Sequence, residues 1–163
     1  MSPNPTDPTP LPVFIPEWSV WDTCITHHYE DASKPAKDFM YELVNMNVDR
    51  AVKLSVIPDE LKEALDGAFG DRTAFDFLME HGASHESIPN ILTKHFASKP
   101  HHRVAVFLLG FWKSINFPEV YIVTEDSSLK ETLNSLRKMG LNFTHLKIVN
   151  STVALQILRE KCK

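Results

Sequence analysis

Two aspartates and a pair of glutamates are the side chains in this sequence best suited to metal chemistry. Asp126 follows the apolar run VYIVT, and Asp22 lies in WSVWDTCI, which we expect to be the first strand. Glu60 and Glu63 are three residues apart in IPDELKEALDG, so they share a face of the helix expected there. Acids gathered at one sheet edge repel each other, and Mg²⁺ or Mn²⁺ relieves that repulsion by taking oxygen ligands. Because a metal-bound water hydrolyses phosphodiesters, these residues predict a metal-dependent phosphodiesterase site.

In this prediction the two aspartates are both metal ligands and catalytic residues, and one of the two glutamates assists them. Thr23 and Thr124 stand beside the aspartates and would orient carboxylates or metal-bound waters. A purely structural role is open for every one of these groups. Asp22 suits a turn after a strand, Asp126 suits the N-cap of the next helix, and the glutamates suit an exposed helix face beside Lys62.

Strands and helices are expected to alternate along the chain. The apolar pattern predicts strands at 18–25, 52–57, 120–124 and 146–149, and helices at 34–47, 73–80, 88–96, 128–140 and 151–161, with a further helix whose first turn contains Pro58. The run 103–114 is nearly all apolar, and its length favours a helix. Strands joined by helices form parallel sheets covered on both faces. The expected fold class is therefore α/β, a three-layer α/β/α sandwich with a mainly parallel sheet, which would collect the acids at its carboxyl edge.

A cationic segment, KHFASKPHHR, precedes the long apolar helix. It contributes Lys94, Lys99 and Arg103, to which Lys113 adds a further charge. No Asp or Glu occurs from residue 87 to residue 118. If this segment lies near the acidic edge, its cations would hold the phosphates of a nucleic acid. The alternative is a solvated loop in front of a buried helix.

The composition suits one intracellular globular domain. The 163 residues are 43% hydrophobic with a formal net charge of −4. We expect a disordered proline-rich tail at residues 1–12 (MSPNPTDPTPLP) and one domain at 13–163. Two distant cysteines favour a reducing compartment, and neither a signal peptide nor a membrane-spanning run is apparent. The expected location is the cytoplasm or the nucleus.

Several of these segments together resemble the PIN-domain nucleases. The resemblance rests on Asp-Thr at residues 22–23, on VKLSVIPDELKEALDGAFG, on YIVTEDSSL and on KMGLNFTHLKIVNSTVALQIL, and it covers roughly residues 18–161. It implies a three-layer α/β/α fold and Mg²⁺- or Mn²⁺-dependent cleavage of single-stranded RNA. The implied partners are RNA, a protein partner and a second copy of the chain.

The acidic set departs from the family pattern at two places. The family's glutamate in the second segment falls on Ala64, and the acid that opens its long helix falls among His101, His102 and Arg103. One reading is a degenerate, weak or inactive endoribonuclease. The alternative is a non-catalytic RNA- or protein-binding module in RNA processing, decay or toxin–antitoxin regulation. A third reading, a phosphatase-like domain with Asp22 as nucleophile, lacks the second aspartate because Cys24 occupies its place.

Overall fold

The computed structural model describes residues 11–26, 34–50, 54–68, 72–94, 96, 98–138, 140 and 146–162. Residues 1–10, which hold most of the predicted proline-rich tail, lie outside this described part. The elements are β1 (Val13–Pro16), α1 (Trp18–Thr26), α2 (Lys34–Arg50), β2 (Val56–Pro58), α3 (Asp59–Ala68), α4 (Arg72–Gly82), β3 (Ser84–Glu86), α5 (Asn90–Thr93), α6 (His102–Ser114), β4 (Val120–Val123), α7 (Leu129–Lys138), β5 (Leu146–Val149) and α8 (Ser151–Lys161).

The strand pairs among the described residues are all parallel. β1, β4 and β5 form one sheet in the order β1-β4-β5, and β2 pairs with β3 in a second. A single parallel bridge between Phe14 and Ser55 aligns the two sheets, and the Phe14 N–H donates to the Leu54 carbonyl at 2.9 Å. The strands therefore run in the order β3-β2-β1-β4-β5, and the direction of the crossovers reverses between β1 and β4. Such a reversal opens a crevice at the carboxyl ends of the two strands.

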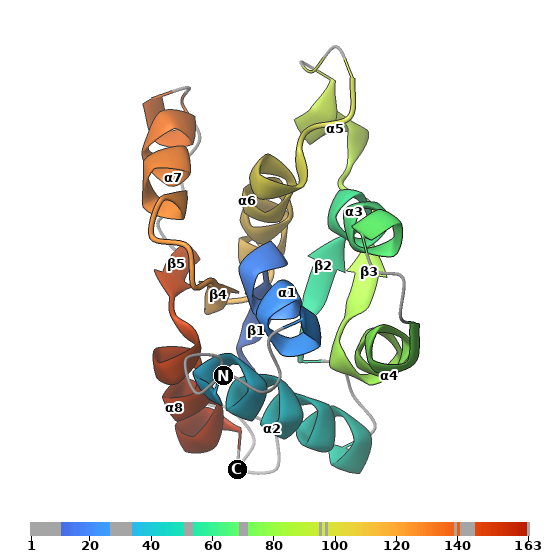
Figure 1. Ribbon diagram of the computed structural model, residues 1–163. Coiled ribbons are helices and arrows are strands. Elements are labelled where there is room, and N and C mark those ends of the chain that lie inside the picture. The colour runs from blue at the N-terminus through green and yellow to red at the C-terminus, as the bar shows by residue number, and fades with distance from the viewer. Residues whose placement is uncertain are drawn as a thin grey trace.

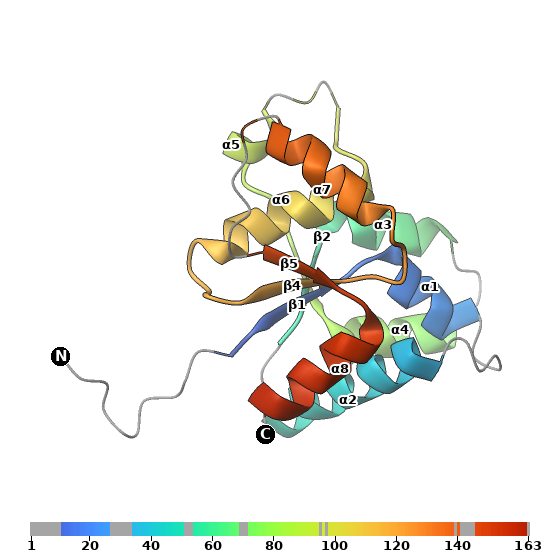
Figure 2. The ribbon, with the colours of Figure 1, turned by 90° about the vertical axis from the view of Figure 1, so that its left-hand side faces the viewer.

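Helices cover both faces of this sheet, as the sequence predicts. Figure 2 shows α3, α6 and α7 on one side of the strands and α1, α2, α4 and α8 on the other. Figure 1 shows β1 and β4 in the middle, with β5 and β2 on either side of them. Phe14 and Ile15 of β1, Phe39 of α2 and Phe107 of α6 are fully buried in the core. The three-layer α/β/α class with a mainly parallel sheet is confirmed. Within the described residues, no helix is long and apolar enough to span a bilayer.

The first strand is not where the sequence analysis places it. WSVWDTCI belongs to helix α1, and the strand is the preceding VFIP, so the predicted strand at 18–25 is wrong. Glu17, between the two, caps the helix: its carboxylate accepts from the Ser19 N–H at 2.9 Å, and its carbonyl accepts from the Val20 N–H at 3.1 Å. Trp21 is then fully buried, and its indole N–H donates to the Pro16 carbonyl at 3.0 Å.

Most other elements lie close to the predicted ranges. β5 and α8 coincide with them, α6 is a helix, and Gly140 follows α7 with φ +94°. Pro58 ends β2 and does not lie in the first turn of a helix, since α3 begins at Asp59. The helix predicted at 88–96 is a single short turn, Asn90–Thr93, and β3 was not predicted. Residues 52–53 of the predicted second strand lie outside the described part.

Candidate functional site

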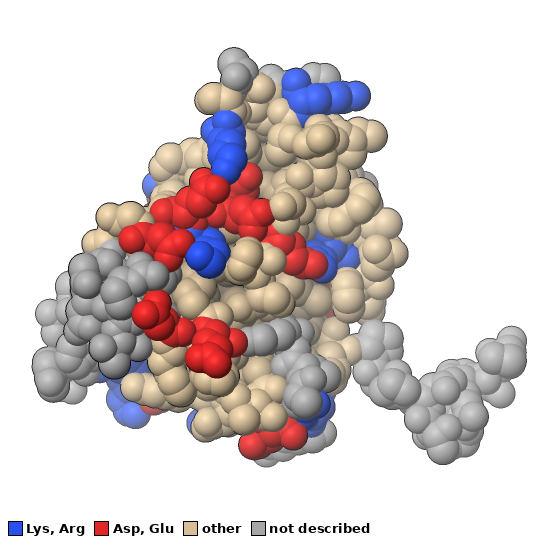
Figure 3. All heavy atoms as spheres, turned by 90° about the vertical axis from the view of Figure 1, so that its right-hand side faces the viewer, with Lys and Arg blue, Asp and Glu red and all other residues tan. Residues whose placement is uncertain are grey.

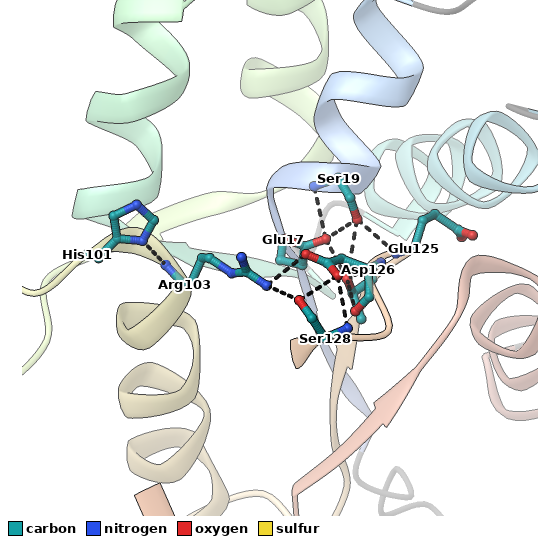
Figure 4. A network of polar contacts seen from close by, with 8 residues as sticks. Glu17, Ser19, His101, Arg103, Glu125, Asp126 and Ser128 are labelled. Carbon is teal, nitrogen blue, oxygen red and sulfur yellow. Dashed lines mark hydrogen bonds and ion pairs between the residues drawn. The ribbon is translucent and has the colours of Figure 1, made fainter. Parts of the chain in front are cut away.

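A polar network occupies the carboxyl edge where β1 and β4 lie side by side. The register pairs Pro16 with Val123, so the next residues of the two strands, Glu17 and Thr124, are neighbours. We call the following residues the carboxyl-edge network (Figure 4): Glu17, Ser19, Arg103, Thr124, Asp126 and Ser128. The network therefore lies at the reversal point of the sheet, the usual ligand position in open α/β folds.

Glu17 is the buried acid of this network. Only 3% of the residue is exposed, and its Oε1 accepts from the Ser19 main chain and hydroxyl and from the Thr124 hydroxyl at 2.5 Å. Burial raises the pKa of this carboxyl, and the neighbouring Asp126 charge adds to the rise, while the hydrogen bonds from Ser19 and Thr124 oppose it. Glu17 thus joins the start of α1 to the end of β4.

Asp126 is held by partners on both of its oxygens. Its Oδ1 accepts from the Ser128 N–H at 2.9 Å and from the Ser128 hydroxyl at 2.7 Å. Its Oδ2 pairs with Arg103 of α6 at 2.7 Å, and the same guanidinium donates to the Ser128 hydroxyl at 2.5 Å. The hydrogen bonds from Ser128, with the Arg103 charge, hold the pKa of Asp126 below its usual value. Asp126 is therefore an ionised carboxylate with a partner on each oxygen.

The structure places the four predicted catalytic acids at three places: Asp22 in α1, Glu60 and Glu63 in α3, and Asp126 after β4. Asp126 follows β4 as expected, but Asp22 lies inside α1 and does not end a strand, so this prediction is wrong. Its neighbour Thr23 is in the same helix. The acid that does end β1 is Glu17, whose signal was its position directly after the apolar run VFIP.

The two predicted glutamates are both in α3, where they differ in surroundings. Glu63 is exposed and pairs with Lys99 at 2.6 Å. Glu60 lines a cavity of about 390 Å³ with Asp59 and Lys99, and its Oε2 is buried without a hydrogen-bond partner in the described part of the chain. Asp59 accepts from the Ser87 hydroxyl at 2.5 Å and contacts the His85 ring at 3.0 Å, and these contacts lower its pKa.

Three of the four predicted phosphate-binding cations are paired with acids. Arg103 pairs with Asp126, Lys99 with Glu63, and Lys113 with Glu86 at 2.6 Å. Lys94 is exposed and has no ion pair among the described residues. Figure 3 shows acidic side chains gathered on the face that carries α3 and α4. Lys99 and Arg103 of the cationic segment therefore pair with acids of other elements, and the segment does not form an isolated positive patch.

This arrangement does not fit a divalent cation. Among the residues that the structure describes, no three or more His, Cys, Asp or Glu side chains are grouped so that they could hold a metal ion. Asp126 already shares its oxygens with Arg103 and Ser128, and Glu17 is bonded to two hydroxyls. A Mg²⁺ ion would need these oxygens as ligands and would stand beside a guanidinium charge.

A column of aromatic rings at the start of α6 was missed in the sequence. The Trp18 and His102 rings stack at 5.2 Å between centroids, and His101 lies 4.2 Å from His102. Burial, helped by the charges of His101 and Arg103, lowers the pKa of His102 to about 4, so its ring is neutral at pH 7. His101 is exposed at the end of the column, next to Arg103 of the carboxyl-edge network.

Comparison with known proteins adds no family to this description. No family model matches the chain, and no curated protein or solved structure matches it either. The function is therefore argued from the site itself.

Proposed function

We propose that this chain is a PIN-like α/β domain that binds single-stranded RNA at its carboxyl edge without hydrolysing it. The observation that carries the proposal is the Arg103–Asp126 pair at 2.7 Å. Asp126 is the acid that the resemblance assigns to the metal, and a positive side chain takes that place. Because Asp126 is paired with the Arg103 guanidinium, the geometry supports RNA binding and argues against metal-dependent hydrolysis of the RNA.

Base binding is supported by the ring column at the start of α6. Proteins hold single-stranded nucleic acids by stacking unpaired bases on aromatic side chains and by placing cations along the backbone. His101 offers an exposed ring in tilted contact with His102, which stacks on Trp18. Because the His102 ring is neutral, it does not repel the adjacent Arg103 charge.

Phosphate binding is supported by cations whose present partners are exchangeable. In the Lys99–Glu63 pair the two side chains are 64% and 60% exposed, so water screens the pair strongly. A phosphate can therefore compete with Glu63 for Lys99. Arg103 is partly exposed, and a guanidinium that binds a carboxylate also binds a phosphate in the same geometry.

The test measures binding and cleavage of one labelled RNA in the same reaction series. A fluorescein-labelled single-stranded RNA is titrated with protein in anisotropy experiments, and the RNA is then run on a denaturing gel after incubation with Mg²⁺ or Mn²⁺. We expect binding that weakens with salt and intact RNA under every metal condition. His101→Ala and Arg103→Gln should each weaken binding by several-fold, because they remove a stacking ring and a phosphate partner.

Arg159→Gln is the matched control. Arg159 also pairs with a carboxylate, Glu42 at 2.9 Å, but it lies near the carboxyl end of α8, away from the carboxyl edge of the sheet. Its loss should leave RNA affinity unchanged. Metal-dependent cleavage that disappears in an Asp22→Asn, Asp126→Asn double variant would establish the nuclease reading. Equal effects of Arg103→Gln and Arg159→Gln would show that RNA is held by overall charge and not by this site.

A further inference from the structure

A groove with a volume of about 430 Å³ lies between α7 and β5, on the open side of the sheet. None of the residues of the carboxyl-edge network lines it. Its floor is aliphatic, with Leu133 and Leu146 buried and Ile148 and Val149 partly exposed. Figure 2 looks onto this side of the molecule and shows β5 as the front strand, with α7 above it.

The rim of the groove is cationic. Lys130 and Arg137 lie seven residues apart on one face of α7, and Lys147 lies on β5. All three are exposed, and none pairs with an acid in the described part of the chain. None of the described residues that line the groove is acidic. In a chain of net charge −4, this concentration of unneutralised positive charge favours an acidic ligand.

The strand in this groove has a main-chain edge available for pairing. β5 is the outermost strand of its sheet and pairs only with β4 within the described residues. The Val149 carbonyl accepts from the Thr124 N–H at 2.9 Å and so faces β4. Because successive residues of a strand direct their amide groups to opposite sides, the N–H and C=O of Ile148 face the open side. A strand added beside β5 would form hydrogen bonds with both of these main-chain groups.

An extended peptide fits these features better than RNA or a second copy of the chain. Among the residues that the structure describes, none that lines the groove is aromatic, so these residues offer unpaired bases no ring on which to stack. Two copies joined edge to edge at β5 would bring Lys147 of each copy close together, which costs energy. A peptide strand would instead use the open amides of β5, fill the aliphatic floor and pair with the rim.

We propose that the groove between α7 and β5 binds an extended acidic peptide, which adds to the sheet as a strand beside β5. Its side chains alternate between two faces. Apolar residues on the α7 side contact Leu133 and Ile148, and Asp or Glu residues on the opposite side pair with Lys147, while acids at the ends of the segment pair with Lys130 and Arg137. The peptide belongs to a partner protein that presents an acidic, strand-forming segment. This binding does not depend on RNA binding at the carboxyl edge.

The test uses a fluorescein-labelled heptapeptide that alternates valine with aspartate or glutamate. Its binding to the full chain is followed by anisotropy, and amide exchange reports on β5. We expect saturable binding, slower exchange of the Ile148 amide, and a roughly tenfold loss of affinity in an Arg137→Glu, Lys147→Glu variant. Lys138→Glu is the matched control, because Lys138 also lies in the last turn of α7 but does not line the groove. It should change the affinity by less than about twofold.

Four results would overturn the proposal. The first is no measurable binding at any soluble peptide concentration. The second is equal binding of the same peptide with alternate amides methylated, since methylation blocks strand pairing. The third is an equal loss in Lys138→Glu, which would reduce the effect to net charge. The fourth is loss of single-stranded RNA binding in the Arg137→Glu, Lys147→Glu variant, with no loss in His101→Ala, which would assign the groove to RNA.

Discussion

Replacing Thr124 by valine tests whether the carboxyl-edge network stabilises the packing of β1 beside β4. The Thr124 hydroxyl donates to Glu17 at 2.5 Å and accepts from the Asp126 N–H at 2.9 Å, and the residue is only 5% exposed. Valine keeps the shape of threonine and lacks the hydroxyl. The substitution therefore removes these two hydrogen bonds, and two longer ones to the Ser19 hydroxyl at 3.3 Å and the Asp126 carbonyl at 3.4 Å, without leaving a large cavity.

The expected loss of stability follows from these contacts. A hydrogen bond contributes about 1 kcal/mol net, and a buried donor left without a partner costs about 1–3 kcal/mol. Glu17 keeps its bonds from Ser19, whereas the Asp126 N–H loses its acceptor. The sum is a destabilisation of roughly 2–4 kcal/mol, which lowers the melting temperature of a chain of this size by roughly 5–15 °C.

Urea denaturation followed by circular dichroism measures this difference. Thr132→Val in α7 is the control, because it makes the same chemical change at a side chain with no hydrogen bond among the described residues. It should alter the free energy of unfolding by less than about 0.5 kcal/mol. If Thr124→Val is no more destabilising than Thr132→Val, the network does not stabilise the packing of β1 beside β4.

The pH dependence of the same variant gives a second readout. Because burial raises the pKa of Glu17, the folded state keeps a proton that the unfolded state releases, and stability falls as pH rises from the ordinary carboxyl pKa through the raised one. The Thr124 hydrogen bond lowers that pKa, so its loss extends the fall to higher pH. Thr124→Val should therefore be more destabilising at pH 8 than at pH 4, and Glu17→Gln should abolish this trend.

Three further perturbations test the packing and the electrostatics of the site. Gly110→Ala should destabilise the protein by about 1–3 kcal/mol in urea denaturation, because its new methyl would lie 2.8 Å from Leu146 Cδ1. Gly67→Ala in α3 should instead stabilise the protein slightly, because no atom lies within 4 Å of the new methyl. The His102 ring should titrate in NMR spectra with a pKa of about 4, and Arg103→Gln should raise that pKa because it removes a nearby positive charge; an ordinary value near 6.5 in the native protein would contradict the burial. As pH falls from 6.5 to 4, the unfolded state takes up this proton first, so stability should fall over that window. Lys99→Ala should leave the melting temperature unchanged, because its ion pair with Glu63 is exposed, while it weakens RNA binding.

The elements that were predicted correctly are those whose pattern is local and strong. The strand at 146–149 and the helix at 151–161 are each bounded by polar residues and coincide with β5 and α8. The first strand failed because both VFIP and WSVWDTCI are apolar, and strand propensity does not separate them. The spacing of Trp18, Trp21 and Ile25, three and four residues, was the helical signal.

The candidate site was predicted only in part, because its residues are brought together across the sheet. Asp126 and Thr124 could be placed at the end of β4 from the apolar run before them. Glu17 could be found only once β1 was located one segment earlier. The pairing of Arg103 with Asp126 joins α6 to the loop after β4, and no local pattern predicts it.

The sequence by itself determined the α/β class, because apolar runs of strand length alternate with helical periodicity and such strands must pair in parallel. It also determined which side chains are chemically capable of binding ions. Only the tertiary structure decided their state: Arg103, Lys99 and Lys113 are neutralised by acids from other elements, while Lys130, Arg137 and Lys147 remain without acidic partners in the described chain. The physical reason is that charge pairing depends on distances of a few ångströms, which the packing of distant segments sets.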